Sequence, residues 1–451
     1  MSVAAKLQSQ AGVVAGQPRP TLRTRDVIAI TVGIVIGAGI FRTPSLVAGA
    51  AGTAEMLLLA WLAGGVLSII GALCYAELAS SAPSAGGDYH FLTRAFGHRL
   101  AFFYAWARLS VIQTGSIALL AFIFGDYATQ LFDLGPLSST WYGLIVVLAV
   151  TALNWAGVRF GAGVQNWLTV VEVLGVVLVI VAGLLLAPAT VPDRGVAGET
   201  SFGLMMVFVL LTFGGWNEAV YVSAELHDSR HRIGRAMVIG LMIVTALYLL
   251  ANLAYLRVLG IQEMAGSNAV AADVMDRAFG PGGAAVISVL IAIAALTSAN
   301  ATAITGARTT YALGRNFPLL RWLGTWSGER DTPGNALIVQ GAIALLLVLG
   351  GSLSRDGFEA VVEYSAPVFW FFFLLVGISL FVLRRREPDA ERPFRVPLYP
   401  LLPAVFCLTC ASLFYASLVH TGPGALVGVA TVALGGLFLL FIKPVPAEEM
   451  E

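Results

Sequence analysis

Charged residues are scarce in this sequence. Asp, Glu, Lys and Arg together make up 12% of the 451 residues, whereas soluble domains contain roughly 25%. A soluble chain of this length would lack the polar surface to cover itself. Acidic and basic residues are equal in number, 26 of each, so no excess positive charge is available to attract nucleic acid. Nucleic acid is therefore excluded as a partner.

Cysteine is also rare, and its placement argues against redox or metal chemistry. The three cysteines, Cys74, Cys407 and Cys410, all lie within apolar stretches. Cys407 and Cys410 have the CxxC spacing, but no histidine or second CxxC accompanies them. We interpret all three as packing thiols and expect neither a metal site nor a cofactor.

Enzyme motifs and a signal sequence are missing as well. No HExxH motif and no nucleophile–base spacing occurs within the apolar segments, so we expect no enzymatic activity. The first 25 residues are polar and lack an apolar core, which predicts that there is no cleavable signal peptide. No soluble output domain is expected either, so a membrane sensor without transport is only a remote alternative.

Apolar residues are abundant instead. They make up 58% of the chain, about 260 residues, enough for twelve membrane spans of about 20 residues each. Short loops separate the spans, which predicts an all-α polytopic membrane protein with twelve transmembrane helices. The apolar segments cover residues 26–50, 55–80, 99–130, 140–157, 164–187, 202–226, 234–259, 283–312, 335–351, 357–383, 398–419 and 423–442.

The basic residues predict the orientation of these segments. If residues 1–25 are cytoplasmic and the spans alternate, 20 of the 26 Lys and Arg residues fall on the cytoplasmic side and 4 on the outer side. This asymmetry satisfies the positive-inside rule. We expect an integral protein of the bacterial inner membrane, embedded in the lipid bilayer, with residues 1–25 and 443–451 as cytoplasmic tails.

Glycine clusters interrupt two of the segments at mid-depth. The first segment contains Gly37 and Gly39, and the sixth contains the run Phe-Gly-Gly-Trp-Asn-Glu at 213–218. Each glycine weakens a helix by about 1 kcal/mol relative to Ala, and unwound backbone at this depth must be buried in protein or line a cavity. One cluster alone would fit close helix packing. Because two clusters lie five segments apart, they predict inverted repeats with a substrate site between the breaks.

Such breaks present backbone groups to a ligand. Amides that begin a half-helix suit a carboxylate, and carbonyls that end the preceding half suit an ammonium. The pair fits the zwitterion of an α-amino acid and requires no catalytic side chain. The expected substrate-binding residues are Ile36, Gly37, Ala38, Gly39 and Ile40 from the first break, and Phe213, Gly214, Gly215, Trp216 and Asn217 from the second.

Three motifs resemble those of a known family. They are GAGIF at 37–41, FGGWN at 213–217 and the Arg- and Pro-rich run at 384–397. Together they resemble the amino acid–polyamine–organocation (APC) superfamily, and within it the L-type amino acid transporter branch. The resemblance implies alternating access and gating aromatics at Phe213, on the outer side of the site, and at Trp370, near the pocket.

The resemblance also implies a LeuT-type architecture. The expected domains are the inverted repeats, spans one to five and six to ten, followed by two further spans. Relatives in animals pair with a glycoprotein through a Cys in the loop after span three, but residues 131–139 contain no Cys. We therefore expect no disulfide-linked partner and a monomer or weak dimer. The domain boundaries are 26–187, 202–383 and 398–442.

Ionisable groups at mid-membrane cost about 3 kcal/mol each on insertion scales, so they are candidates for function. Glu172 lies midway along the fifth segment, where L-type members commonly carry a Lys. We expect it to couple transport to H⁺ or Na⁺, and the resemblance places Thr297 and Ser298 of the eighth segment opposite it. An ion pair between Glu172 and Arg108 is the structural alternative.

Two further charges lie near the breaks. Glu218 follows the second break directly and is expected to cap the next half-helix or act as a gate, because negative charge is favourable at a helix N-terminus. If Glu218 faces the pocket instead, it favours a cationic ligand such as arginine or a polyamine. Arg108 is expected to snorkel to the cytoplasmic face.

These observations predict a secondary transporter of small to medium neutral L-amino acids. It would work by alternating access, as an exchanger or a proton-coupled symporter. The alternative is a cationic amino acid or polyamine transporter.

Overall fold

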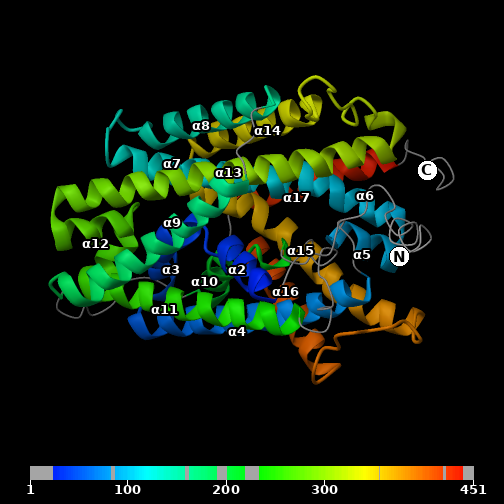
Figure 1. The fold of residues 1–451 in the computed structure, drawn as a ribbon, viewed down its shortest axis with the longest axis horizontal. Helices are drawn as coiled ribbons and strands as arrows, with labels where there is room; N and C mark the ends of the chain where they lie inside the picture. The colour runs from blue at the N-terminus through cyan, green and yellow to red at the C-terminus, as the bar shows by residue number, and fades with distance from the viewer. Residues whose placement is uncertain are drawn as a thin grey trace, which may run out of the picture.

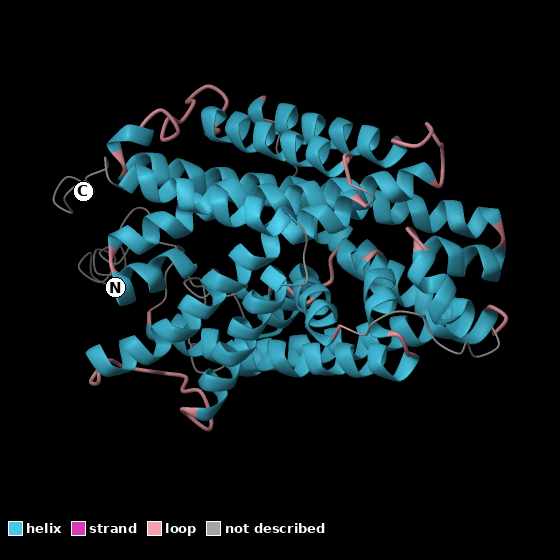
Figure 2. Cartoon of the chain, turned by 180° about the vertical axis from the view of Figure 1, so that it is seen from behind, coloured by secondary structure: helices cyan, strands magenta, loops and turns pink. Residues whose placement is uncertain are grey.

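Apolar sequence and helical structure coincide along the chain. The computed structural model describes residues 24–82, 87–157, 162–189, 201–218, 233–354, 356–419 and 423–439. Within these ranges the chain is almost wholly helical and forms no strand (Figure 2). Each predicted apolar segment coincides with a helix or with a helix that is interrupted. This confirms the prediction of an all-α polytopic membrane protein.

The uninterrupted helices differ in length. In the part of the chain that the structure describes, eight helical stretches are long and apolar enough to cross a membrane, and shorter apolar stretches cover Val170–Leu186, Phe202–Thr212 and Gly424–Leu439. The helices without a break are α4 (Ala54–Ser81), α8 (Ser138–Trp155), α9 (Ala162–Val181), α13 (Pro281–Asn316), α14 (Gly334–Gly351), α15 (Gly357–Arg386), α16 (Leu401–Val419) and α17 (Pro423–Leu439). By contrast, α11 (Ile233–Gly266) is kinked at Gly260, where φ is 71° and ψ is 170°.

Other segments change helix type or stop part-way. The third apolar segment consists of α6 (His98–Ala107), the π-helical turn η2 (Arg108–Ile112) and α7 (Gln113–Thr129). A second π-helical turn, η3 (Ala182–Leu186), follows α9. The first segment is divided into α2 (Thr24–Val35), the 3₁₀ turn η1 (Ala38–Phe41) and α3 (Thr43–Ala51), and α10 (Phe202–Thr212) ends early within the sixth.

The interrupted helices lie between two groups of long ones. Figure 1 shows α7, α8, α13 and α14 side by side along one long side of the bundle, and α4 beside α11 along the other. The helices α2, α3 and α10 lie between these groups. Breaks in the first and sixth segments are therefore enclosed by protein, as unwound backbone at this depth requires.

The hydropathy pattern did not predict two short helices that lie in the connections between the long helices. They are α5 (Gly87–Phe96) and α12 (Val270–Phe279), which lie at opposite ends of the bundle (Figure 1). Both mix buried apolar residues with charged ones, so their average hydropathy is low although one face packs on the bundle. The α5 helix contributes to the site described below.

The polar run after α15 folds back onto the end of α4. Glu77 is fully buried there, and its carboxylate accepts hydrogen bonds from Arg384 Nε at 2.6 Å and Nη2 at 2.5 Å. The backbone amide of Val396 donates to Glu77 Oε2 at 2.7 Å. This bidentate pair fastens the end of α15 and the following loop to α4.

Replacing Glu77 with Gln is expected to destabilise the protein strongly. Breaking a buried ion pair by removing one partner costs about 3–5 kcal/mol, because the other charge is left uncompensated. Thermal unfolding of the purified protein in detergent measures the change. Glu391→Gln, an exposed residue in the same run, serves as the control and should leave the midpoint unchanged; equal midpoints for both variants would contradict the assignment.

Candidate substrate cavity

The first break lies between α2 and η1. Gly37 separates the two with extended backbone angles, φ −108° and ψ −178°. Tyrosines from other helices satisfy carbonyls on both sides of it: Tyr248 Oη donates to Val35 O at 2.7 Å, and Tyr127 Oη donates to Phe41 O at 2.7 Å. Two elements distant in sequence thus hold the unwound backbone in place.

The second break contacts the first. After α10 ends at Thr212, the chain turns through residues 213–215, and Gly215 has a positive φ of 99°. A Cβ on Gly215 would lie 2.9 Å from Ile34 Cγ2 and 3.1 Å from the Ile34 carbonyl oxygen. Only glycine therefore allows this conformation and this approach. Residues 219–232, with Glu225, Asp228, Arg230 and Arg232, lie outside the described residues.

A cavity of about 640 Å³ lies beside both breaks. Small residues, with no side chain or a single methyl group, form its wall at the breaks, so a ligand has access to the backbone there. These residues are Gly37, Ala38, Gly39, Gly214 and Gly215. Polar groups elsewhere on the wall are Thr43, Asp88, Tyr104, Arg108, Gln113, Ser116, Thr212, Asn217, Glu218, Ser298, Thr302 and Thr305.

Four of the expected substrate-binding residues do not line the cavity. The side chains of Ile36, Ile40, Phe213 and Trp216 are buried in the core. Phe213 packs against Trp61 and Tyr248, with ring centroids 6.0 Å and 5.1 Å away. Thr212 and Gly214 occupy the cavity face of the turn, so the residue between them points toward α4 and α11. In this structure Phe213 therefore packs in the core and does not line the cavity.

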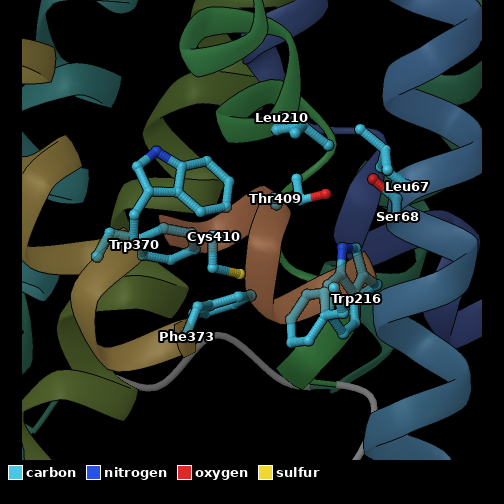
Figure 3. Close-up of a pocket in the computed structure, with 11 residues that line it drawn as sticks. Leu67, Ser68, Leu210, Trp216, Trp370, Phe373, Thr409 and Cys410 are labelled. Atoms are coloured by element: carbon cyan, nitrogen blue, oxygen red, sulfur yellow. The ribbon is translucent and has the colours of Figure 1, made fainter. Parts of the chain in front are cut away.

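Trp370 lies behind the cavity wall. It lines a small void of about 20 Å³, and Figure 3 shows it with Trp216, Phe373 and Cys410, which line the same void. Phe369 and Phe373 stack with centroids 4.2 Å apart and line both the void and the large cavity. The aromatic residues of α15 that line the large cavity are Phe358, Phe369, Phe372 and Phe373, and not Trp370. Cys410 is a free, buried thiol, as the packing interpretation predicts.

A buried arginine next to the cavity-lining Thr43 joins several helices. Arg42, 3% exposed, donates from Nε to Asp126 Oδ2 of α7 at 3.2 Å, and from Nη1 to Ser45 Oγ at 2.6 Å. Its Nη2 pairs with Asp356, which caps the N-terminus of α15. The Ser267 carbonyl, just before α12, accepts a further bond at 3.4 Å. This network ties α3, α7, α15 and the α12 end of the bundle together.

A second charged cluster lies toward the α5 end. Arg108 Nη2 donates to Glu218 Oε1 at 3.0 Å, and its Nη1 to the Tyr104 hydroxyl at 3.1 Å. Tyr104 in turn donates to Asp88 Oδ2 at 3.0 Å. When the oxygen and nitrogen of the Gln113 side-chain amide are exchanged, its oxygen accepts a hydrogen bond from Arg108 Nη2 at 2.7 Å. The prediction that Arg108 snorkels to a membrane face is therefore wrong, because this buried side chain finds its partners on the cavity wall.

Burial dominates the titration of Asp88, which lies on α5, outside the membrane-spanning helices. Desolvation raises the pKa of this carboxyl to about 6, although the Arg108 guanidinium opposes the shift. The negative charge of Glu218 raises the pKa further, and the Tyr104 and Tyr75 hydroxyls lower it. Asp88 is therefore mostly ionised at pH 7 and neutral below about pH 5.

Glu172 lies behind the cavity wall, against α13. It is 7% exposed, and Ser298 Oγ donates to its Oε1 at 3.3 Å. Ser298 itself lines the cavity, whereas the Thr297 hydroxyl donates to Ile293 and Ala294 carbonyls of its own helix. The alternative of a Glu172–Arg108 pair is wrong, because Arg108 pairs with Glu218.

Sequence reasoning missed three members of the Arg108 cluster. Asp88 falls in a loop by hydropathy, and Tyr104 and Gln113 carry no charge that would distinguish them from other polar residues in a span. The only available signal was Arg108 itself: a charge near mid-span needs partners. Neither their identity nor their position follows from local sequence, since they come from α5, α6 and α7.

Paired broken helices beside a polar cavity, in a bundle of apolar helices, define a membrane transporter. The chain matches the amino acid permease family over residues 22–438 and belongs to that family. Its relatives place it in the APC superfamily, in a branch like the L-type amino acid transporters. The protein is thus an integral membrane transporter and not an enzyme.

Curated relatives resemble nearly the whole chain. The b(0,+)-type amino acid transporter 1 of Rattus norvegicus is 31% identical, over 96% of this chain and 91% of its own length. The serine/threonine exchanger SteT of Bacillus subtilis is 29% identical, over 83% and 86%. The human cystine/glutamate transporter is 29% identical, over 92% and 84%. These relatives share amino acid transport but differ in substrate.

Two glycine substitutions at the breaks should differ in their effect on stability. Gly215→Ala is expected to cost about 1–3 kcal/mol, since it forces a side chain into a strained φ region, where it also meets Ile34. Gly37→Ala is the matched control: its φ is ordinary, and its Cβ would have nothing within 4 Å. Thermal unfolding without ligand measures both, and equal midpoints would refute the close contact of the breaks.

Proposed function

We propose that this protein transports small to medium neutral L-amino acids by alternating access, as an exchanger or a proton-coupled symporter. The observation that supports this most directly is the meeting of the two breaks at one cavity, with Gly37–Gly39 and Gly214–Gly215 on its wall. The substrate carboxylate binds the amides that follow Gly37, and its ammonium binds carbonyls near the second break.

The available carbonyls are limited by the tyrosine contacts. Val35 O and Phe41 O already accept from Tyr248 and Tyr127, so these two acceptors are engaged. The break itself, at residues 36–39, and the turn at 213–215 supply the backbone groups for the zwitterion. Asn217 lines the same part of the cavity and offers an amide that donates and accepts.

The charged network at Arg42 supports an inward-facing arrangement. It lies near Ser267 at the α12 end, which the distribution of basic residues assigns to the outside. The cavity extends from the breaks toward Asp88 and Arg108, on the α5 side, which is assigned to the cytoplasm. Opening to the outside then requires Arg42 to leave Asp126 or Asp356, so this buried cluster acts as the outer gate.

Glu172 is the proposed coupling residue. No ion pair among the described residues involves its carboxylate, and its contact is the Ser298 hydroxyl. A buried carboxylate without a cationic partner must take up a proton or bind a cation. Ser298 also lines the cavity. This side chain therefore links a ligand in the cavity to proton or cation binding at Glu172.

The protein is proposed to act in a bacterial inner membrane without a disulfide-linked partner, as a monomer or weak dimer. All three cysteines lie within α4 and α16 and not in a loop. This placement supports the absence of a covalent heavy chain.

Counterflow in proteoliposomes tests the transport proposal. Vesicles preloaded with unlabelled alanine, serine or leucine should accumulate the labelled amino acid well above empty vesicles, because exchange needs no net gradient. Gly37→Val, which fills the space in front of the backbone, should abolish the signal while the protein stays folded. Accumulation of putrescine with none of these amino acids would overturn the proposal.

Replacement of Glu172 with Gln separates coupling from binding. If Glu172 carries the proton, acidifying the outside should increase net uptake by the native protein several-fold, and Glu172→Gln should reduce this ratio to about one because an amide does not titrate. Counterflow should survive. Glu55→Gln, at an exposed helix end, should behave as the native protein. A pH or Na⁺ response that persists in Glu172→Gln would remove the residue from the coupling step.

A further inference from the structure

The loop between α13 and α14 is held against the end of a membrane-crossing helix. It includes the 3₁₀ turn η6 (Pro318–Leu320) and lies at the same end of the bundle as α6 (Figure 1). Asn335, in the first turn of α14, donates from Nδ2 to Trp322 O at 2.8 Å and to Thr325 Oγ1 at 2.9 Å. Because the membrane-crossing stretch of α14 begins at Gly334, this loop lies at the level of the lipid headgroups.

Apolar side chains of the loop divide into a buried and an exposed set. Phe317, Leu320 and Leu323 are buried in a small hydrophobic cluster with residues of α6. Leu319 and Trp322, in contrast, are 54% and 51% exposed. The buried set fixes the loop on the bundle, and the exposed set presents apolar surface at the membrane boundary, where large aromatic side chains act as anchors.

Two more exposed tryptophans lie near Trp322. Trp326 packs against Tyr311 of α13, with ring centroids 5.2 Å apart. Trp155 is the last residue of α8, and its ring lies 3.4 Å from the position that a Cβ on Gly334 would occupy. Both are 39% exposed. Indoles from α8 and from the loop thus gather where α8 ends and α14 begins.

Arginines lie among these aromatic rings. The guanidinium carbon of Arg330 is 3.7 Å from the centroid of the Trp155 ring. Arg315 Nη1 donates to the Tyr311 hydroxyl at 3.5 Å. The donors of a guanidinium lie in its plane, so stacking on a ring leaves them available to an anion.

Positive charge predominates in this part of the chain. Residues 308–335 contain four arginines and two acidic residues. Among the described residues, no ion pair involves Arg315, Arg321 or Arg330. Their charges are therefore available to an anion from outside the chain.

We propose that this region binds the phosphate group of an anionic phospholipid at the membrane boundary. The guanidinium groups donate to phosphate oxygens, which their planar geometry suits, and the indoles lie among the glycerol and upper acyl groups. This binding does not depend on which substrate the protein carries. The exposed residues that form this headgroup surface are Trp155, Arg315, Arg321, Trp322, Trp326 and Arg330.

A second copy of this chain matches the headgroup surface poorly. In a two-fold dimer the same patch faces itself, which would bring arginines of both copies together. A bilayer supplies negative charge instead, because anionic lipids of the cytoplasmic leaflet attract basic segments near the membrane. The distribution of basic residues assigns this end of the bundle to the cytoplasm.

The bound lipid has a route to the substrate cavity. The loop directly follows α13, and Ser298 and Thr302 of α13 line the cavity. A phospholipid on the headgroup surface therefore holds one end of a helix that forms the cavity wall.

Thermal unfolding of the purified full-length protein in a non-ionic detergent tests the proposal. The probes are dioleoyl phosphatidylglycerol and dioleoyl phosphatidylcholine, which share acyl chains and differ in headgroup charge. Phosphatidylglycerol should raise the unfolding midpoint more, because a ligand that binds only the folded state stabilises it. Inorganic phosphate at the same concentration should leave the midpoint unchanged. Equal stabilisation by phosphatidylcholine or by inorganic phosphate would refute a site for an anionic lipid.

A triple variant locates the binding. Arg315→Gln, Arg321→Gln and Arg330→Gln together should raise the half-saturating concentration of phosphatidylglycerol about tenfold or more, since each basic residue near a membrane surface contributes about fivefold in affinity. The matched control removes the same charge from exposed positions that are also assigned to the cytoplasm, and should leave that concentration nearly unchanged. If both triple variants weaken binding equally, net charge and not this surface attracts the lipid, and the proposal fails. The control substitutions are Arg99→Gln, Arg385→Gln and Arg395→Gln.

Two tryptophan variants test the contribution of the indoles. Trp322 and Trp141 are 51% and 53% exposed, but Trp141 lies near the opposite end of α8 from Trp155. Without lipid, both Trp322→Ala and Trp141→Ala should unfold near the native midpoint, because exposed side chains contribute little to stability. Trp322→Ala should bind phosphatidylglycerol more weakly than Trp141→Ala does. Equal affinity of the two variants would show that the indoles do not contact the lipid and would overturn the proposed surface.

Discussion

The interruption of the first span is the constraint on which the rest of the structure depends. Breaking a helix at mid-membrane exposes backbone groups that lipid does not satisfy. The protein meets this demand with tyrosines from α7 and α11, which donate to carbonyls on either side of Gly37. The flanking helices must therefore surround the break, and the second break must approach it closely enough to require Gly215.

Charged side chains follow the same logic. The buried residues Arg42 and Arg108 both have acidic partners from other parts of the chain. Arg42 pairs with Asp126 and Asp356, and Arg108 pairs with Glu218. Arg108 and Glu218 line the cavity, whereas the Arg42 cluster lies near Ser267, just before α12. Ion pairs of this kind add little net stability, but rearranging them changes which helices are tied together. That property suits the proposed alternation of access, in which one end closes while the other opens.

Much of the architecture was predictable because hydropathy is a local property. The apolar segments, the glycine-rich breaks and the small residues at 37–39 and 214–215 were all found from sequence. The expected positions that differ from the structure concern the direction of side chains. Phe213 and Trp370 were assigned to the pocket, yet Phe213 packs in the core and Trp370 lies behind Phe369 and Phe373. A shift of one residue along a turn points the side chain to the opposite side. The local composition does not indicate which side that is.

The sequence by itself determined that this chain is a helical membrane protein, where its helices break and which family it resembles, because each of these depends on residues close together in the chain. Only the tertiary structure decided which charges meet. Arg108 could have reached the membrane face or Glu172, but the packing of α5 and the second break around α6 and η2 placed Asp88 and Glu218 beside it. Partners in a low-dielectric interior are chosen by distance in space, and that distance is set by the packing of helices far apart in sequence.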